Sequence, residues 1–194
     1  MKIRPGAVVL VLIASAHLAG CGGARVDGSA TQTYTVGGTV SGLSGSGLVL
    51  QLNGAGNLGV IASGAFAFSA VFSGGSSYNV SVLTQPTSPS QTCAVANGSG
   101  TVGSAKVTNI SVSCTTNSFT IGGTVSGLSG TGLVLRNNGG SDLAIGANGG
   151  FAFSAPVASA AAYAVTVLAQ PSNPNQICTS PTAAARWARP MSQR

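Results

Sequence analysis

This chain of 194 residues contains 29 glycines and 44% hydrophobic residues, but only 5% of its residues are charged. With two acidic residues and one histidine it has few groups able to move a proton, which argues against acid–base catalysis. The net charge of +6 comes mostly from the two ends of the chain, so the central part is nearly neutral and a basic groove for nucleic acid is not supported.

The segment from Met1 to Gly20 has the pattern of a secretory signal peptide. Lys2 and Arg4 precede an apolar run from Ala7 to Ala16, and small residues follow before Cys21. We expect a signal helix within residues 1–20 that is too short and wrongly flanked to stay in a membrane as a spanning helix.

The segment Leu18-Ala19-Gly20-Cys21 resembles the lipobox of bacterial lipoproteins. The resemblance implies cleavage before Cys21 and acylation of that residue, with each buried methylene adding roughly 0.8 kcal/mol to membrane binding. Gly22, rather than aspartate, follows the cysteine, which implies a lipid-anchored protein of the outer membrane, on its periplasmic face or at the cell surface. An ordinary signal peptide with a chance cysteine is the alternative. Residues 21–33 are expected to be the acylated cysteine and a flexible tether.

Residues 34–93 are repeated 85 positions later as residues 119–178, with 33 of the 60 aligned pairs identical. A period of this length is too long for a solenoid turn and suits one small domain. We therefore expect a first module at 34–114, a linker at 115–118 and a second module at 119–178.

Alternating apolar residues predict an all-β fold for both modules. Leu48, Leu50 and Leu52 would share one face of a strand, and Phe66 and Phe68 another, with Gly-, Asn- and Pro-rich turns between the strands. In the first module we expect seven strands, near Tyr34–Val40, Gly47–Leu52, Leu58–Ala62, Ala65–Ala70, Tyr78–Gln85, Gln91–Ala96 and Val107–Cys114. Seven short strands in a domain of this size favour an immunoglobulin-type β-sandwich.

The order GTVSGL, LVLQL, GAFAF and YNVSV is also similar to the carboxypeptidase-regulatory or transthyretin-like sandwiches of surface proteins. In addition, it resembles tandem Gly/Ser-rich repeats of bacterial lipoproteins and secreted proteins, mostly of unknown function. This resemblance covers nearly the whole chain after the signal, and it implies structural modules without naming an active site.

Cys93 and Cys114 end the last two predicted strands of the first module. An exported chain lies where disulfides persist, so we expect these cysteines to pair. The bond would close a loop of roughly 20 residues and stabilise the module by about 3 kcal/mol. Two buried free thiols are the alternative.

The second module loses the repeat after Cys178, which is expected to be an unpaired thiol because its partner is missing. In a shifted reading frame, codons for Thr179–Ser192 can spell the sequence Val95–Thr108 at every position except Lys106. We therefore interpret residues 179–194 as a frameshifted, disordered tail; a genuine basic tail is the alternative.

Loss of the closing strand would leave the second module with an open sheet edge and an uncovered apolar face. We expect this module to be unstable, protease-sensitive or completed by a strand from another chain. Cys178 would then be available for an intermolecular disulfide.

No catalytic, cofactor or metal site is expected. Asp27 lies in the tether, and Asp142 replaces Asn57 of the first module, so we expect both carboxylates to be solvated. Calcium would need clustered carboxylates. The aromatic residues at inward-facing positions are expected to pack in the cores, with a sugar-binding platform as the minority alternative; they are Tyr34, Tyr78, Tyr163, Phe66, Phe68, Phe151 and Phe153.

The leading hypothesis is therefore a non-enzymatic envelope lipoprotein whose repeats have a structural or display role, as a truncated remnant of a longer surface protein. The alternative is a surface adhesin or glycan-binding module that acts through the loops Asn53–Asn57, Val71–Ser77 and Pro86–Ser90. An enzyme comes third.

Overall fold

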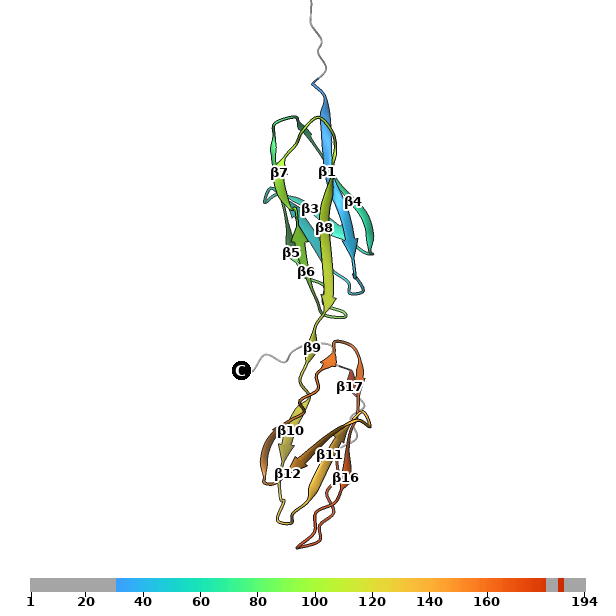
Figure 1. Ribbon diagram of the computed structural model, residues 1–194, viewed down its shortest axis with the longest axis vertical. Helices are drawn as coiled ribbons and strands as arrows, with labels where there is room; N and C mark the ends of the chain where they lie inside the picture. Colours follow the sequence, from blue (N-terminus) through green and yellow to red (C-terminus); the bar gives the residue numbers. More distant parts are fainter. Residues whose placement is uncertain (1–30, 181–184, 187–194) are drawn as a thin grey trace, which may run out of the picture. The chain divides into compact units, whose positions relative to one another are not determined.

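The computed structural model describes residues 31–180 and 185–186 (Figure 1). Within these residues the regular structure is β-strand throughout, which confirms the all-β class. The signal helix expected in 1–20, the expected lipidation site Cys21 and most of the expected tether lie outside the described residues, as does most of the tail that begins at Thr179. Among residues 31–180 and 185–186 there is no helix of the length and apolar character needed to cross a membrane.

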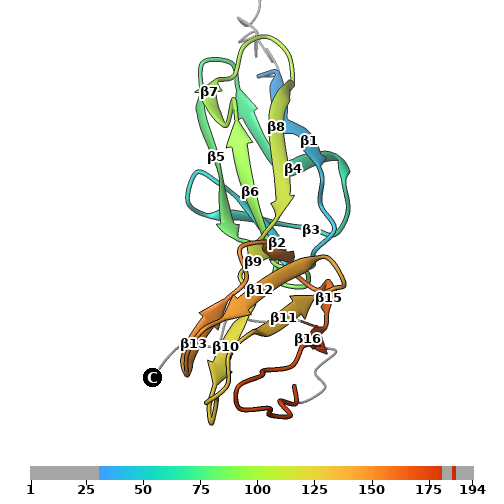
Figure 2. The same ribbon diagram turned by 60° about the horizontal axis from the view of Figure 1, so that its bottom comes forward.

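The first unit consists of eight strands: β1 (Thr33–Ser41), β2 (Leu48–Leu52), β3 (Gly56–Val60), β4 (Gly64–Ser73), β5 (Ser77–Thr84), β6 (Gln91–Ala96), β7 (Ser99–Thr101) and β8 (Val107–Thr116). They form two four-stranded sheets, with the orders β4-β1-β8-β6 and β3-β2-β5-β7 (Figures 1 and 2). Buried side chains from both sheets share one core, among them Val36, Leu50, Phe68, Val80 and Ile110. The expected alternation along β2 is confirmed, because Leu48, Leu50 and Leu52 are all buried.

The prediction of seven strands in the first unit is wrong by one. The additional strand is β7, whose sequence Ser99-Gly100-Thr101 contains no apolar residue and is exposed at every position. It is a strand because its backbone pairs with β5, from Ser77↔Thr101 to Asn79↔Ser99. A pattern of apolar residues therefore could not reveal it.

Strand β1 is central to its sheet, because it pairs with β4 on one side and with β8 on the other. The pairing with β4 is antiparallel, whereas the pairing with β8 is parallel and places Gly38 opposite Ile110. The backbones of β1 and β8 come so close here that a Cβ atom on Gly38 would overlap the carbonyl group of Ile110. This close approach explains why glycine occupies position 38.

The disulfide expected between Cys93 and Cys114 is confirmed. The two cysteines are directly opposite each other on β6 and β8, with their Cα atoms 4.0 Å apart. The bond therefore joins neighbouring strands of one sheet. In this respect it differs from the disulfide of antibody domains, which connects the two sheets.

The second unit repeats the strand pairing of the first. Its strands are β9 (Ser118–Phe119), β10 (Gly122–Val125), β11 (Leu133–Asn137), β12 (Ser141–Ile145), β13 (Gly149–Ala152), β14 (Val157–Ala158), β15 (Ala162–Tyr163), β16 (Val165–Ala169) and β17 (Ala185–Arg186). The pair Leu48↔Val60 has its counterpart in Leu133↔Ile145, 85 positions on. The same shift relates Ser77↔Thr101 to Ala162↔Arg186, so β17 takes the position of β7.

Each unit has a core of its own. The buried residues of the second core are Ile121, Leu128, Leu133, Leu135, Ile145, Phe153 and Val157. β8 ends at Thr116 and β9 begins at Ser118, so Asn117 alone lies between the last strand of one unit and the first strand of the next. Most of the linker expected at 115–118 therefore belongs to strands.

Two strands of the first unit, β6 and β8, have no counterpart in the described part of the second. The residues equivalent to β6 begin at Gln176, and residues 176–180 form no strand. In the first unit β6 pairs with β8 alone. Because a strand is defined by its ladder, residues 176–180 form no strand where the described residues contain no equivalent of β8.

Candidate functional site

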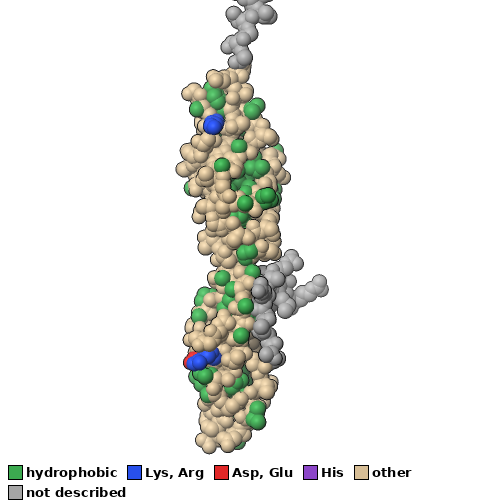
Figure 3. Space-filling view, turned by 90° about the vertical axis from the view of Figure 1, so that its right-hand side faces the viewer, with side chains coloured by type: hydrophobic (Ala, Val, Ile, Leu, Met, Phe, Trp, Pro, Cys, Tyr) green, Lys and Arg blue, Asp and Glu red, His purple; other side chains and the backbone are tan. Residues whose placement is uncertain are grey.

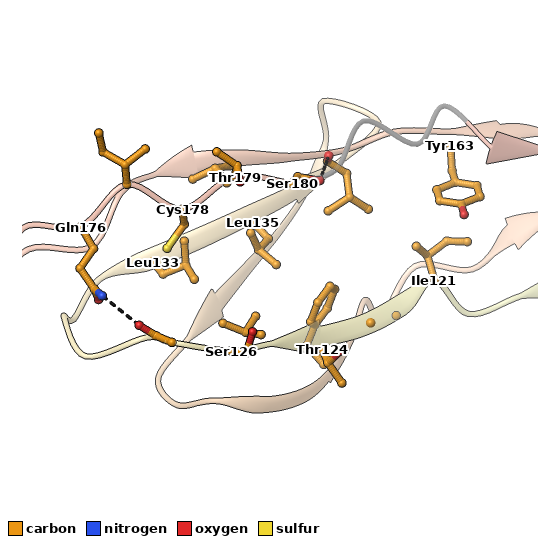
Figure 4. Close-up of a pocket in the computed structure, with 18 residues that line it drawn as sticks. Ile121, Thr124, Ser126, Leu133, Leu135, Tyr163, Gln176, Cys178, Thr179 and Ser180 are labelled. Carbon is orange, nitrogen blue, oxygen red and sulfur yellow. Dashed lines mark hydrogen bonds between the residues drawn. The ribbon is translucent and has the colours of Figure 1, made fainter.

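The second unit has a cavity of about 640 Å³ between β10 and residues 176–180. Thr124 and Ser126 lie along one side, Gln176 and Cys178 lie along the other, and Leu133 and Leu135 lie between them (Figure 4). We call this cavity the strand groove. Its described lining contains no charged side chain.

The strand groove lies where the first unit holds β8. In the first unit β8 fits between β1 and β6, with Val112 opposite both Val40 and Val95. β10 is the equivalent of β1, but in the described residues it pairs with β13 alone. The groove is thus bounded by two backbone segments whose first-unit equivalents both pair with β8.

Exposure of equivalent residues shows what a strand at the position of β8 would cover. Gly38 and Val40 are buried on β1, whereas Gly123 is exposed and Val125 is half-buried on β10. Likewise Tyr78, Val80, Gln91 and Cys93 are buried, whereas Tyr163, Val165, Gln176 and Cys178 are half-buried. The uncovered apolar surface therefore follows the track of β8.

Residues 176–178 keep the position of β6 because two glutamines hold them. The backbone N–H of Cys178 donates to Oε1 of Gln170 at 2.8 Å, and Nε2 of Gln170 donates to the carbonyl of Cys178 at 3.1 Å. In the first unit Gln85 makes the same two bonds with Cys93.

Gln176 fixes the same segment to the loop that follows β10. Its Oε1 accepts the N–H groups of Ser129 and Gly130, both at 2.7 Å. Its Nε2 donates to the carbonyl of Gly127 at 2.9 Å, the bond that Figure 4 marks with a dashed line. Gln91 makes the equivalent three bonds and a fourth, from its Nε2 to Oγ1 of Thr116 on β8. Both sides of the groove are therefore held by contacts within the second unit.

Cys178 is the one free cysteine within the described residues. It is half-buried, and in Figure 4 its sulfur points into the strand groove near Leu133. Its equivalent, Cys93, is bonded to Cys114 of β8. The thiol thus faces the place where a partner cysteine lies in the first unit.

The sequence drew attention to Cys178 but not to Gly123, Gln170 or Gln176. A signal for them was available, because Gly38, Gln85 and Gln91 are identical at the equivalent positions. Identity between the two repeats did not show whether a residue forms part of a turn or contacts β8. That distinction required the contacts of β8.

The charged pair of the second unit lies outside the groove. Asp142 is exposed, as expected, and is held by Arg136 through bonds of 2.5 Å from Nε and 2.8 Å from Nη2. These hydrogen bonds lower the pKa of the Asp142 carboxyl below its ordinary value. In the first unit Gln51 donates to Asn57 at the same positions, so an amide pair becomes an ion pair. On the face shown in Figure 3, charged side chains are few.

The aromatic residues pack into the two cores, as the sequence predicted. Tyr78, Phe68 and Phe153 are buried, and the other four are partly buried against the same cores. Phe66 meets Phe68 edge to face, and Phe151 meets Phe153 in the same way.

Two of the loops considered for ligand binding make hydrogen bonds to the neighbouring strands β5 and β6. In Asn53–Asn57, Oδ1 of Asn53 accepts the N–H of Asn79 at 2.7 Å. Pro86 begins the loop Pro86–Ser90, and its carbonyl accepts the N–H of Gln91.

Among the described residues, no three His, Cys, Asp or Glu side chains come together as a metal site.

Comparisons of the sequence with models of protein families and with curated proteins found no match. The strand groove is thus characterised by its own geometry and by comparison with the first unit.

Proposed function

We propose that the chain is a non-enzymatic lipoprotein of the cell envelope, held at the outer membrane through acylated Cys21. Its two repeats, which we assign to the immunoglobulin-like or transthyretin-like sandwiches, act as structural or display modules. The observation that supports this proposal is a strand pairing that occurs twice, as Leu48↔Val60 and as Leu133↔Ile145, behind a sequence that ends Leu18-Ala19-Gly20-Cys21. Repeating a structural unit lengthens the chain beyond its membrane anchor without adding a reactive site.

Two features of the fold suit such a role. Each unit has a separate core, so each is able to act as a module. The first unit is also crosslinked through Cys93 and Cys114, and such bonds persist in oxidising compartments outside the cytoplasm.

The anchor is tested by replacing its cysteine. In a bacterial host, the wild-type chain should enter the detergent phase, incorporate a clickable palmitate analogue and fractionate with the outer membrane. Cys21→Ser should abolish labelling and leave the protein in the aqueous phase, because several acyl chains supply the membrane affinity. Cys178→Ser is the matched control, since it also removes a thiol but should leave both properties unchanged.

Two results would overturn the proposal. One is a wild-type chain without acyl groups at Cys21, and the other is a Cys21→Ser chain that still partitions with the membrane.

A further inference from the structure

We propose that the strand groove is a receptor for an extended peptide with the pattern of β8, which inserts parallel to β10 and is locked by a disulfide to Cys178. This proposal goes beyond a structural role and does not depend on the anchor. It rests on the comparison of the two units, because the first unit holds β8 between β1 and β6, whereas the described residues of the second unit place no strand at that position.

The first unit defines the register of the inserted strand. In β8, Ile110 is opposite Gly38, Val112 is opposite Val40, and Cys114 is opposite Cys93. When this register is transferred to the equivalent positions of the second unit, the incoming strand places an apolar residue beside Gly123, a second beside Val125 and a cysteine beside Cys178. These three residues are two positions apart and so face the core together.

Gly123 supports the same assignment. Its equivalent, Gly38, must be glycine because a Cβ atom there would overlap the carbonyl of Ile110. On β10 the nearest atom to such a Cβ is on the ring of Phe151 at 3.1 Å, a side-chain atom rather than backbone. Within the described residues, therefore, no backbone approaches Gly123 as Ile110 approaches Gly38, whereas a strand in the groove would do so.

The chemistry of the groove selects the occupant. Its described lining is uncharged, with Leu133, Leu135, Val165 and Val167 among its residues, which suits a strand with uncharged apolar residues at alternate positions. The backbones of β10 and of residues 176–179 lie on either side of that strand. A charged residue at an inward position would be desolvated without a partner.

β8 of a second intact copy cannot fill this role without loss of its own unit. Its Ile110 and Val112 are 1% and 0% exposed, and Cys114 is already bonded to Cys93. We therefore commit to a strand from a different polypeptide that brings its own cysteine.

The locking step is thiol–disulfide exchange, and its co-reactant is a mixed disulfide on the incoming cysteine. The thiolate of Cys178 attacks the peptide sulfur, the bond between that sulfur and its small-thiol cap breaks, and the cap leaves as a thiolate that takes up the proton. One disulfide is consumed and one is formed, so no other oxidant is needed.

The test uses the full chain with Cys21→Ser, so that exchange reports on Cys178. The probe is a synthetic peptide with the sequence of β8, VTNISVSCTT, whose cysteine carries glutathione. Peptide mapping should find the adduct on Cys178, and released glutathione gives the rate. We expect a rate at least tenfold above that of the same peptide with Ile110→Asp and Val112→Asp.

A noncovalent readout separates insertion from thiol reactivity. The β8 peptide with Cys114→Ser should slow amide hydrogen exchange in β10 without forming any adduct. Amide hydrogen exchange in β1 should stay unchanged, because β8 already occupies the position beside β1.

Gly123→Ala tests the close approach of the strand. In the absence of peptide, this variant should show the same amide hydrogen exchange as the parent chain. It should capture the β8 peptide at least tenfold more slowly. Gly146→Ala is the matched control, because a Cβ atom there meets nothing within 4 Å and the residue lies outside the groove. It should capture the peptide as the parent chain does.

The proposal is overturned if the charged peptide and the Gly123→Ala chain react as fast as the parent pair, which would indicate simple thiol reactivity. It is also overturned if Cys178 reacts with oxidised glutathione but not with the β8 peptide, or if the chains form Cys178–Cys178 dimers in preference to capturing it.

Discussion

At the scale of single residues, the second core differs from the first where a polar residue, Asn137, takes the place of the apolar Leu52. Both side chains are 3% exposed, and both come from equivalent strands, β11 and β2. Oδ1 of Asn137 is buried and has no hydrogen-bond partner in the part of the chain that the structure describes. A buried polar atom without a partner costs about 1–3 kcal/mol, so this position weakens the second unit.

Asn137→Leu should therefore stabilise the second unit by about 1–3 kcal/mol, because it removes the unpaired oxygen and restores apolar burial. Hydrogen exchange followed by mass spectrometry reports each unit separately and should show slower opening of β11, β12 and β16. Leu52→Asn is the converse control and should speed opening of the first unit alone. Unchanged or faster opening of the second unit in Asn137→Leu would mean that the amide is already satisfied.

At the scale of elements, β6 and β8 support each other in the first unit. They form a ladder from Gln91↔Thr116 to Ala96↔Ser111, and the disulfide lies within it. Since β6 has no other partner strand, any loss of β8 also frees β6. The disulfide opposes the loss of β8. It closes a loop between residues 21 positions apart and so lowers the conformational entropy of the unfolded chain.

Replacing Cys93 and Cys114 together by alanine should lower the free energy of unfolding of the first unit by about 3 kcal/mol, as loop closure predicts for this separation. Urea titration monitored by hydrogen exchange of β1 and β8 is the measurement. Cys178→Ala serves as the control and should leave the first unit unchanged. Equal stability of the double variant and the parent would show that packing alone holds β8 in place.

The sequence predicted some elements well because their side chains report on the core. The alternation of Leu48, Leu50 and Leu52 located β2, and the places of Cys93 and Cys114 in two predicted strands indicated the disulfide that joins β6 and β8. By contrast, β7 and its counterpart β17 are held by backbone pairing with β5 and β15, which leaves no apolar pattern.

The sequence predicted the strand groove only indirectly, through the loss of the repeat pattern that would supply a closing strand. Loss of the repeat after Cys178 indicated an open edge, but the sequence could not show that Gln170 and Gln176 keep residues 176–178 in place. Nor could it show which glycine of β10 faces the position that β8 takes in the first unit. Both facts depend on contacts between residues at least eight positions apart, which a local pattern does not encode.

At the scale of the whole molecule, two units with nearly the same pairing differ in how complete their cores are. In the first, β8 contributes three buried side chains, Ile110, Val112 and Cys114. Burial of an aliphatic side chain is worth roughly 1.5–3 kcal/mol, so Ile110 and Val112 together contribute about 3–6 kcal/mol. That is comparable with the roughly 5–15 kcal/mol by which a whole domain is stable.

The chain should therefore unfold in two steps, with the second unit first. Differential scanning calorimetry should show two transitions, and hydrogen exchange should assign the lower one to β10–β16. Limited proteolysis near that temperature should cut residues 176–180 before any site in the first unit. Captured β8 peptide should raise the lower transition and leave the upper one in place, because a ligand stabilises only the state to which it binds. A single transition, or equal resistance of both units to protease, would mean that residues outside the described part complete the second core.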